Sequence, residues 1–135
     1  MTIQLSTTVR NGRLDSIETV VGTSAILLLR TGAPPADVAA ANSGTVLATL
    51  NLPADWMDAA ASGSKAKAGT WQDASADGTG TCGHFRLYAS DGTTAHIQGT
   101  VTITGGGGDM TLDNTSIASG QSVTITGFTL TAGNA

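Results

Sequence analysis

The start of the chain carries apolar residues at helical spacing. Three of them follow one another at i, i+3 and i+7: Leu14, Ile17 and Val21. Residues 6–8 offer hydroxyls that suit a helix N-cap, and Gly22 follows as a stop signal. The pattern predicts an amphipathic helix from about Thr7 to Val21. Because Gly12 in its middle costs about 1 kcal/mol relative to alanine, we expect this helix to form by packing, on its own sheet or on a neighbouring subunit.

From residue 25 onward the hydrophobic pattern has a period of two. The continuous apolar run 25–29 predicts a strand covered on both faces, and the alternating segment 46–52 predicts a half-buried strand. The prolines within 32–35 predict a loop between them. Residues 53–57 begin with proline and predict one or two helical turns. The small, polar segment 60–69 predicts a mobile loop.

The second half of the chain predicts hairpins. Phe85 and Leu87 alternate with His84, Arg86 and Tyr88, which predicts a strand with one apolar and one polar face. The dipeptide Asp91-Gly92 predicts a type I′ turn into a strand that covers 97–103. The glycine run 105–108 then predicts a flexible hairpin connection.

The last strand changes phase. Val123 and Ile125 alternate, and so do Phe128 and Leu130, but the two pairs are out of step at Gly127. This predicts a β-bulge that keeps both pairs on the core face. Short strands with regular turn signals are typical of an antiparallel β-sandwich or barrel, jelly-roll-like. We therefore predict a mainly β protein, with an N-terminal arm and amphipathic helix over 1–22 and a β-sandwich domain over 23–135.

Composition narrows the class of protein. The 135 residues are 40 % hydrophobic, which argues against disorder. The formal net charge is −4 and the six cations are scattered, so we expect no nucleic-acid partner. The longest apolar run is too short to span a bilayer, so no membrane partner is expected, and the first residues lack the pattern of a secretory signal. The lone Cys82 rules out an intrachain disulfide and fits a reducing cytoplasm.

Motifs that carry chemistry are weak in this chain. Acidic, strand-like residues follow the glycine run 105–108, whereas a phosphate cradle needs a helix N-terminus there. Cys82, His84 and His96 could approach one another on a hairpin, but without a carboxylate on that face we expect solvent-facing or interface histidines rather than zinc ligands. We therefore predict no catalytic residues, no metal site and no cofactor, and interpret the chain as a non-enzymatic protein.

The aromatic residues leave two interpretations. Exposed Trp56, Trp71 or Tyr88 would suit a carbohydrate-binding module. Buried, the tryptophans would close a core that has few other large residues, and we favour this interpretation.

Several stretches of the sequence resemble a family of small tailed-bacteriophage proteins, described mostly as virion-associated or uncharacterised. The resemblance covers nearly the whole chain. It rests on residues 3–11, 13–18, 30–35, 52–57, 63–71, 83–86 and 113–117. It implies a component of the phage particle, made in the bacterial host cytoplasm and located on the capsid surface or in the tail.

Our first hypothesis from the sequence is a capsid decoration (cement) protein that bridges major-capsid subunits, as a homo-oligomer such as a trimer. The contacts would come from the N-terminal segment and one loop: Leu5, Val9, Arg10, Arg13, Leu14, Ile17 and Trp56. A tail, baseplate or head-tail connector component is the alternative within the virion. A carbohydrate-binding module on the virion surface is the alternative of another class.

Overall fold

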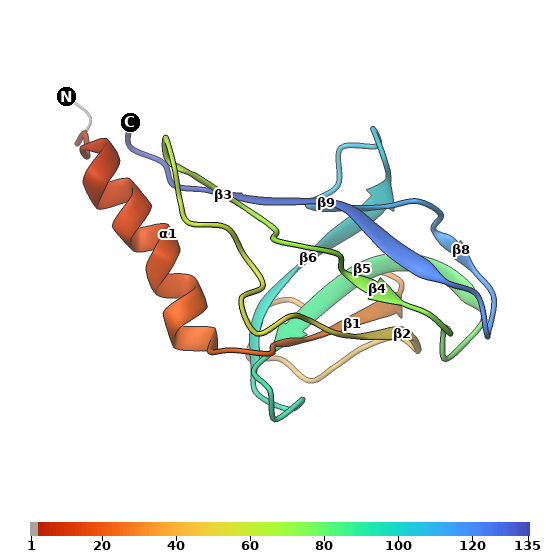
Figure 1. Ribbon diagram of the computed structural model, residues 1–135. Helices are drawn as coiled ribbons and strands as arrows, with labels where there is room; N and C mark the ends of the chain where they lie inside the picture. The colour runs from red at the N-terminus through yellow and green to blue at the C-terminus, as the bar shows by residue number, and fades with distance from the viewer. Residues whose placement is uncertain (1–2) are drawn as a thin grey trace.

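The computed structural model describes residues 3–135 and has one helix followed by nine strands (Figure 1). The predicted mainly β fold with an N-terminal helix is confirmed. The elements are α1 (Thr7–Val21), β1 (Ile26–Thr31), β2 (Val46–Asn51), β3 (Ser64–Ala66), β4 (Gln72–Asp73), β5 (Gly80–Tyr88), β6 (Ala95–Ile103), β7 (Met110–Leu112), β8 (Ser116–Ile117) and β9 (Val123–Thr131). Within the described residues, α1 lacks the length and hydropathy needed to cross a membrane.

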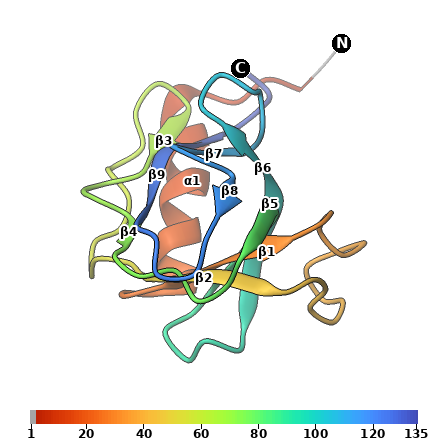
Figure 2. The same ribbon diagram turned by 90° about the vertical axis from the view of Figure 1, so that its right-hand side faces the viewer.

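The strands form one strongly curled, mixed sheet. Its order is β2-β1-β5-β6-β7-β9-β3, with β4 beside β9 and β8 beside β5 (Figure 2). The outer edge of β2 contacts the segment around β4, because the Asp77 and Gly78 N–H groups both donate to Leu47 O. The Asp73 carboxylate accepts from the Thr49 N–H at 3.0 Å. The curl thus brings the first strands back toward β9.

One strand pair differs from the predicted antiparallel pattern. β7 runs parallel to β6, with Val101 opposite Met110. The glycine run 105–108 folds back along β6 instead of closing a hairpin, so that interpretation was wrong. Gly108 packs closely against Thr102, and a Cβ added to Gly108 would lie 2.9 Å from the backbone nitrogen of Thr102. The loop needs glycine to lie against the strand it has just left.

The predicted β-bulge is confirmed. Thr111 pairs with Gly127 while Leu112 pairs with Ile125, so β9 carries one extra residue at Thr126. Ile125 and Phe128 are consequently both buried on the core side.

Two local predictions were wrong. The turn at Asp91-Gly92 is not type I′, because Gly92 has a positive φ of 71° and Asp91 does not. The Asp91 carboxylate instead accepts from the N–H groups of Thr93 and Thr94. Residues 53–57 contain a bend at 54–55 and a β-bridge from Met57 to Lys67 rather than helical turns.

Helix α1 has the predicted bounds. The Ser6 hydroxyl accepts from the Val9 N–H at its start, and the Gly22 N–H donates to Glu18 O at its end. Leu14 and Val21 are buried, and Ile17 packs against the core. The helix lies at one end of the curled sheet, beside β3 (Figures 1 and 2).

A row of aromatic side chains runs through the core. Trp56 and Trp71 have ring centroids 6.1 Å apart, and Phe128 lies 5.6 Å from Trp71 and 5.5 Å from Phe85. Both tryptophans are fully buried. Their predicted role in closing the core is confirmed.

Candidate functional site

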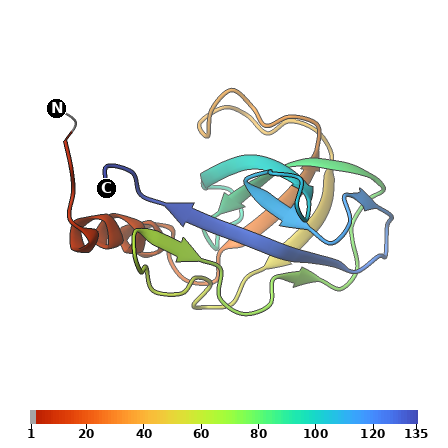
Figure 3. The same cartoon turned by 90° about the horizontal axis from the view of Figure 1, so that it is seen from above.

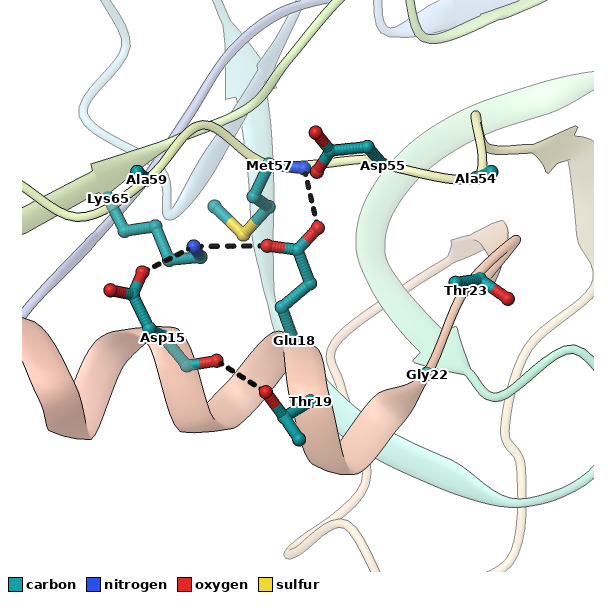
Figure 4. Close-up of a pocket in the computed structure, with 10 residues that line it drawn as sticks. All are labelled: Asp15, Glu18, Thr19, Gly22, Thr23, Ala54, Asp55, Met57, Ala59 and Lys65. Carbon is teal, nitrogen blue, oxygen red and sulfur yellow. Dashed lines mark hydrogen bonds and ion pairs between the residues drawn. The ribbon is translucent and has the colours of Figure 1, made fainter.

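The helix is attached to the sheet through a buried lysine of β3. Lys65 is only 2 % exposed, and its ammonium contacts Asp15 Oδ1 at 2.8 Å and Glu18 Oε2 at 3.0 Å (Figure 4). Its third hydrogen bond goes to Asp58 O at 2.8 Å. An ammonium has three N–H donors, so all of them are satisfied. We call Asp15, Glu18 and Lys65 the helix clamp.

The clamp shifts the pKa values of Asp15 and Lys65. The hydrogen bond from Lys65, with a second one from the Ala60 N–H, lowers the pKa of Asp15. Burial by itself would lower the pKa of Lys65, but hydrogen bonds and attraction from Asp15 and Glu18 outweigh it and raise that pKa above its usual value. Lys65 and Asp15 therefore stay an ion pair across neutral pH.

Side chains of α1 also hold the segment that leads into β3. Asn11, Asp15 and Glu18 accept from the backbone N–H groups of Gly63, Ala60 and Met57 at 2.9, 2.9 and 3.3 Å. Residues 60–69, predicted as a mobile loop, instead contain β3 and take part in these bonds. The alternation of Lys65 and Lys67 with alanines was the sequence signal for this short strand.

A hollow of about 610 Å³ lies between the last turns of α1 and residues 54–59 (Figure 4). Its charged lining consists of the helix clamp and Asp55. Because every N–H of the Lys65 ammonium is already bonded, the lysine offers no donor or nucleophile to a ligand in this arrangement. The chemistry of this hollow is that of a structural ion pair.

The opposite side of α1 is exposed. Val9, Gly12, Arg13, Ser16 and Val20 lie on it, at offsets of three and four residues, and we call them the outer face of α1. Val9 is 49 % and Val20 is 70 % exposed. The acids Asp15 and Glu18 turn toward Lys65, so the outer face carries a cation, Arg13, and two apolar side chains.

The structure divides the seven interface residues expected from the sequence. Leu14 and Trp56 are buried and Ile17 packs on the core, so these three contact their own chain rather than a partner. The Trp56 indole N–H donates to Gly22 O at 2.9 Å. The four others are exposed or partly exposed to solvent: Leu5, Val9, Arg10 and Arg13. Val20 was missed because it falls outside the apolar spacing that predicted the helix.

Arg10 lies at the rim of that surface. Its guanidinium bonds to the Thr7 hydroxyl at 3.4 Å, and a Cβ on Gly63 would stand 2.1 Å from its Nη1 atom. Glycine at position 63 is therefore what lets the arginine lie flat against the segment before β3. The Arg10 guanidinium thus lies against the segment before β3 rather than on the outer face of α1.

The predicted polar face of β5 is buried under the segment 32–45. Arg86 donates to Ala40 O and Asn42 Oδ1 at 3.0 and 2.7 Å and also to Val38 O. The Tyr88 hydroxyl donates to Asn42 Oδ1 at 2.6 Å. His84 is fully buried, with Nδ1 2.9 Å from Gly32 O, so the expectation of a solvent-facing or interface histidine was wrong for it.

The burial of the aromatic residues and of Cys82 bears on the carbohydrate-binding and metal-binding interpretations of the sequence. Trp56, Trp71 and Tyr88 are buried, so none of them is an exposed platform for stacking a sugar. Cys82 is buried beside the backbone of His84, with Sγ 3.7 Å from its carbonyl oxygen. Within residues 3–135, no three His, Cys, Asp or Glu side chains gather closely enough to hold a metal ion.

Comparison with known proteins adds no relative. Neither the protein-family models, nor the curated proteins, nor the solved structures contain a match to this chain.

Proposed function

We propose that this chain is a non-enzymatic structural protein of a tailed-phage particle, which decorates the capsid by binding across major-capsid subunits. The observation that carries the proposal is the outer face of α1. It is a partly apolar surface on a helix whose other side is fixed to the sheet. The resemblance of the sequence to small tailed-phage proteins supplies the biological setting.

The helix is suited to dock without reordering. The helix clamp and the backbone bonds to Asn11, Asp15 and Glu18 already hold it in place. A partner therefore pays little conformational entropy to bind it. Burying Val9 and Val20 contributes at most about 1.5–3 kcal/mol each. One copy binds weakly by this surface, and many copies together stabilise an assembled shell by mass action.

The charge of Arg13 on the outer face of α1 favours a different protein, rather than a second copy of this chain, as the partner there. Arg13 stands near the middle of the outer face. Two copies that paired antiparallel through it would bring two guanidinium groups together, and such like-charge contacts are costly. A capsid surface that offers a carboxylate to Arg13 and an apolar patch to the valines is complementary. A tail or head-tail connector protein would use the same surface at a much lower copy number.

The first test is the number of copies in purified particles of the encoding phage, measured by quantitative mass spectrometry against the major capsid protein. Hundreds of copies support decoration. A few tens or fewer would move the protein to the tail or neck, and absence from the particle would overturn the virion role.

The second test is binding to particles that lack the protein. The double variant Val9→Asp/Val20→Asp and the variant Arg13→Glu should each bind at least about tenfold more weakly than the parent. Ile103→Asp is the matched control, because Ile103 is 54 % exposed on β6, outside the helix. Equal loss in the control, or full binding by the double variant, would contradict the assigned surface.

A further inference from the structure

A second hollow opens where the sheet splays apart. β7 joins β6 to β9, but it reaches only Val101–Ile103 of β6 and Ile125–Phe128 of β9. β7 begins at Met110. On the N-terminal side of Met110, no other strand among residues 3–135 lies between the first half of β6 and the last residues of β9. A groove of about 610 Å³ lies between them. Its lining includes Phe85, Ile97, Gln98, Asp109, Phe128 and Leu130, and we call it the β6–β9 groove.

Both walls of the groove are strand edges. Phe128 O accepts from the Lys67 N–H and the Ala132 N–H donates to Gly63 O, so these residues face β3. Because backbone groups alternate in direction along a strand, Thr129 and Thr131 face the groove. On β6 the Thr100 N–H bonds to Asp109 Oδ2 at 2.9 Å, away from β5, and by the same alternation Gln98 faces the groove. Such edges bind an extended peptide backbone.

The floor of the groove is apolar. Phe85 and Phe128 form part of the buried aromatic row, and the partly buried Ile97 and Leu130 pack against the same core. A strand that enters the groove would therefore gain backbone partners on both sides and a pocket for an apolar side chain beneath. These features specify an extended segment with apolar residues at alternate positions.

The same chain carries such a segment. Residues 3–5, which we call the arm, precede the helix without regular secondary structure and place Ile3 and Leu5 at alternate positions. Ile3 is 75 % exposed, the highest value among the large hydrophobic residues described. The Leu5 N–H donates to Asn134 O at 2.6 Å and the Asn134 side-chain amide donates to Ile3 O at 3.3 Å, so the arm lies beside the C-terminal segment while the Ile3 side chain stays exposed (Figures 2 and 3).

We propose that the β6–β9 groove binds the arm of a second copy of this chain. The contact is head to tail, since the arm of one copy enters the groove of the next. Repetition of such a contact closes into a ring when the rotation allows. The contact is separate from the outer face of α1, so it extends the proposed function by joining copies while the helices bind the shell.

The test is the oligomeric state of the full chain by native mass spectrometry and light scattering. The parent should form a closed oligomer. Ile3→Asp and Thr129→Pro, which removes the groove-facing N–H, should each weaken self-association about tenfold or more. Thr129→Ala keeps that N–H and Ile103→Asp changes an exposed isoleucine elsewhere, so both should leave the oligomer intact. A monomeric parent, or an unchanged oligomer in the two test variants, would overturn the proposal.

A mixed cross-link shows which copy supplies the arm. In a Cys82→Ala background, a Gln4→Cys chain is mixed with a chain carrying Thr129→Cys or Thr131→Cys and oxidised. Disulfide-linked pairs of the two chains are expected for at least one position. Their absence from both mixtures would overturn exchange between copies. Particle binding by Ile3→Asp is measured separately, so a failed arm contact leaves the capsid proposal to its own test.

Discussion

Lys65 and Asp15 are 50 residues apart in sequence, yet Nζ of Lys65 lies 2.8 Å from Oδ1 of Asp15. The contact joins a three-residue strand to the middle of α1, and Glu18 completes it at 3.0 Å. The lysine is buried while Asp15 keeps half of its side chain exposed. The pair therefore sits at the edge of the core, where its main effect is to fix the direction in which the helix presents its other side.

Replacing Lys65 by methionine should destabilise the protein. The change removes the ammonium that contacts Asp15, Glu18 and Asp58 O, although the two carboxylates keep their backbone donors and are near enough to the surface to regain water. We expect a loss of about 1–3 kcal/mol in the free energy of unfolding. Urea denaturation followed by tryptophan fluorescence measures it. Lys67→Met is the matched control, because the Lys67 ammonium makes an exposed hydrogen bond to Gly69 O, and the change should alter stability by less than about 0.5 kcal/mol.

Acid should destabilise the fold through Asp91 and Asp15. The side-chain hydrogen bond from Thr94, with backbone donors from residues 93 and 94, lowers the pKa of Asp91 to about 2. The unfolded-state pKa of aspartate is about 3.9. A carboxylate whose pKa is lower in the folded state stabilises the fold above the unfolded-state value, and this contribution is lost as pH falls toward the folded-state value.

Asp91→Asn should therefore lower the melting temperature at pH 7, and the difference from the parent should shrink between about pH 4 and pH 2. Melting temperatures measured across this range test the sign. A difference in melting temperature that stayed constant down to pH 2 would show that the hydrogen bonds to residues 93 and 94 do not depend on the charge of the Asp91 carboxylate. Asp55→Asn, at an exposed position on another loop, serves as the control.

Cys82 should be inert in the native protein. Burial raises the pKa of its thiol to about 11, so the reactive thiolate is scarce at neutral pH. An aromatic disulfide reagent at pH 8 should label it only as fast as the protein opens, and at full rate in denaturant. Rapid labelling of the folded chain would mean that β5 is exposed in solution more often than its pairing with β1 and β6 allows.

Local sequence signals predicted the local structure well. The bounds of α1 followed from the N-cap hydroxyls and Gly22, and the bulge in β9 followed from the phase change at Gly127. Each of these signals acts within a few residues of the feature it produces. The type I′ turn failed because Asp91 prefers to cap two following N–H groups, which a dipeptide rule does not consider.

Contacts between distant residues could not be predicted in the same way. Lys65 gave no sign that it would be buried, because its partners lie on the helix. His84 and Arg86 alternate with apolar residues and so resembled a solvent-facing row, but the segment 32–45 covers them. Leu14 and Ile17 were correctly placed on the apolar side of α1, yet sequence alone could not tell whether their own sheet or a partner would bury them.

Arg86 should control the order of the segment 32–45. Its guanidinium donates hydrogen bonds to Val38 O, Ala40 O and the Asn42 side chain. A lysine would replace only part of this planar set of donors. Arg86→Met should speed amide hydrogen exchange across residues 36–44 and cost about 1–3 kcal/mol of unfolding free energy, with Arg86→Lys between it and the parent. Tyr88→Phe removes one hydroxyl bond to the same asparagine and should have a smaller effect. If exchange over 36–44 stayed at the parent rate in Arg86→Met, the segment would be held by its prolines and its apolar contacts instead of by the arginine.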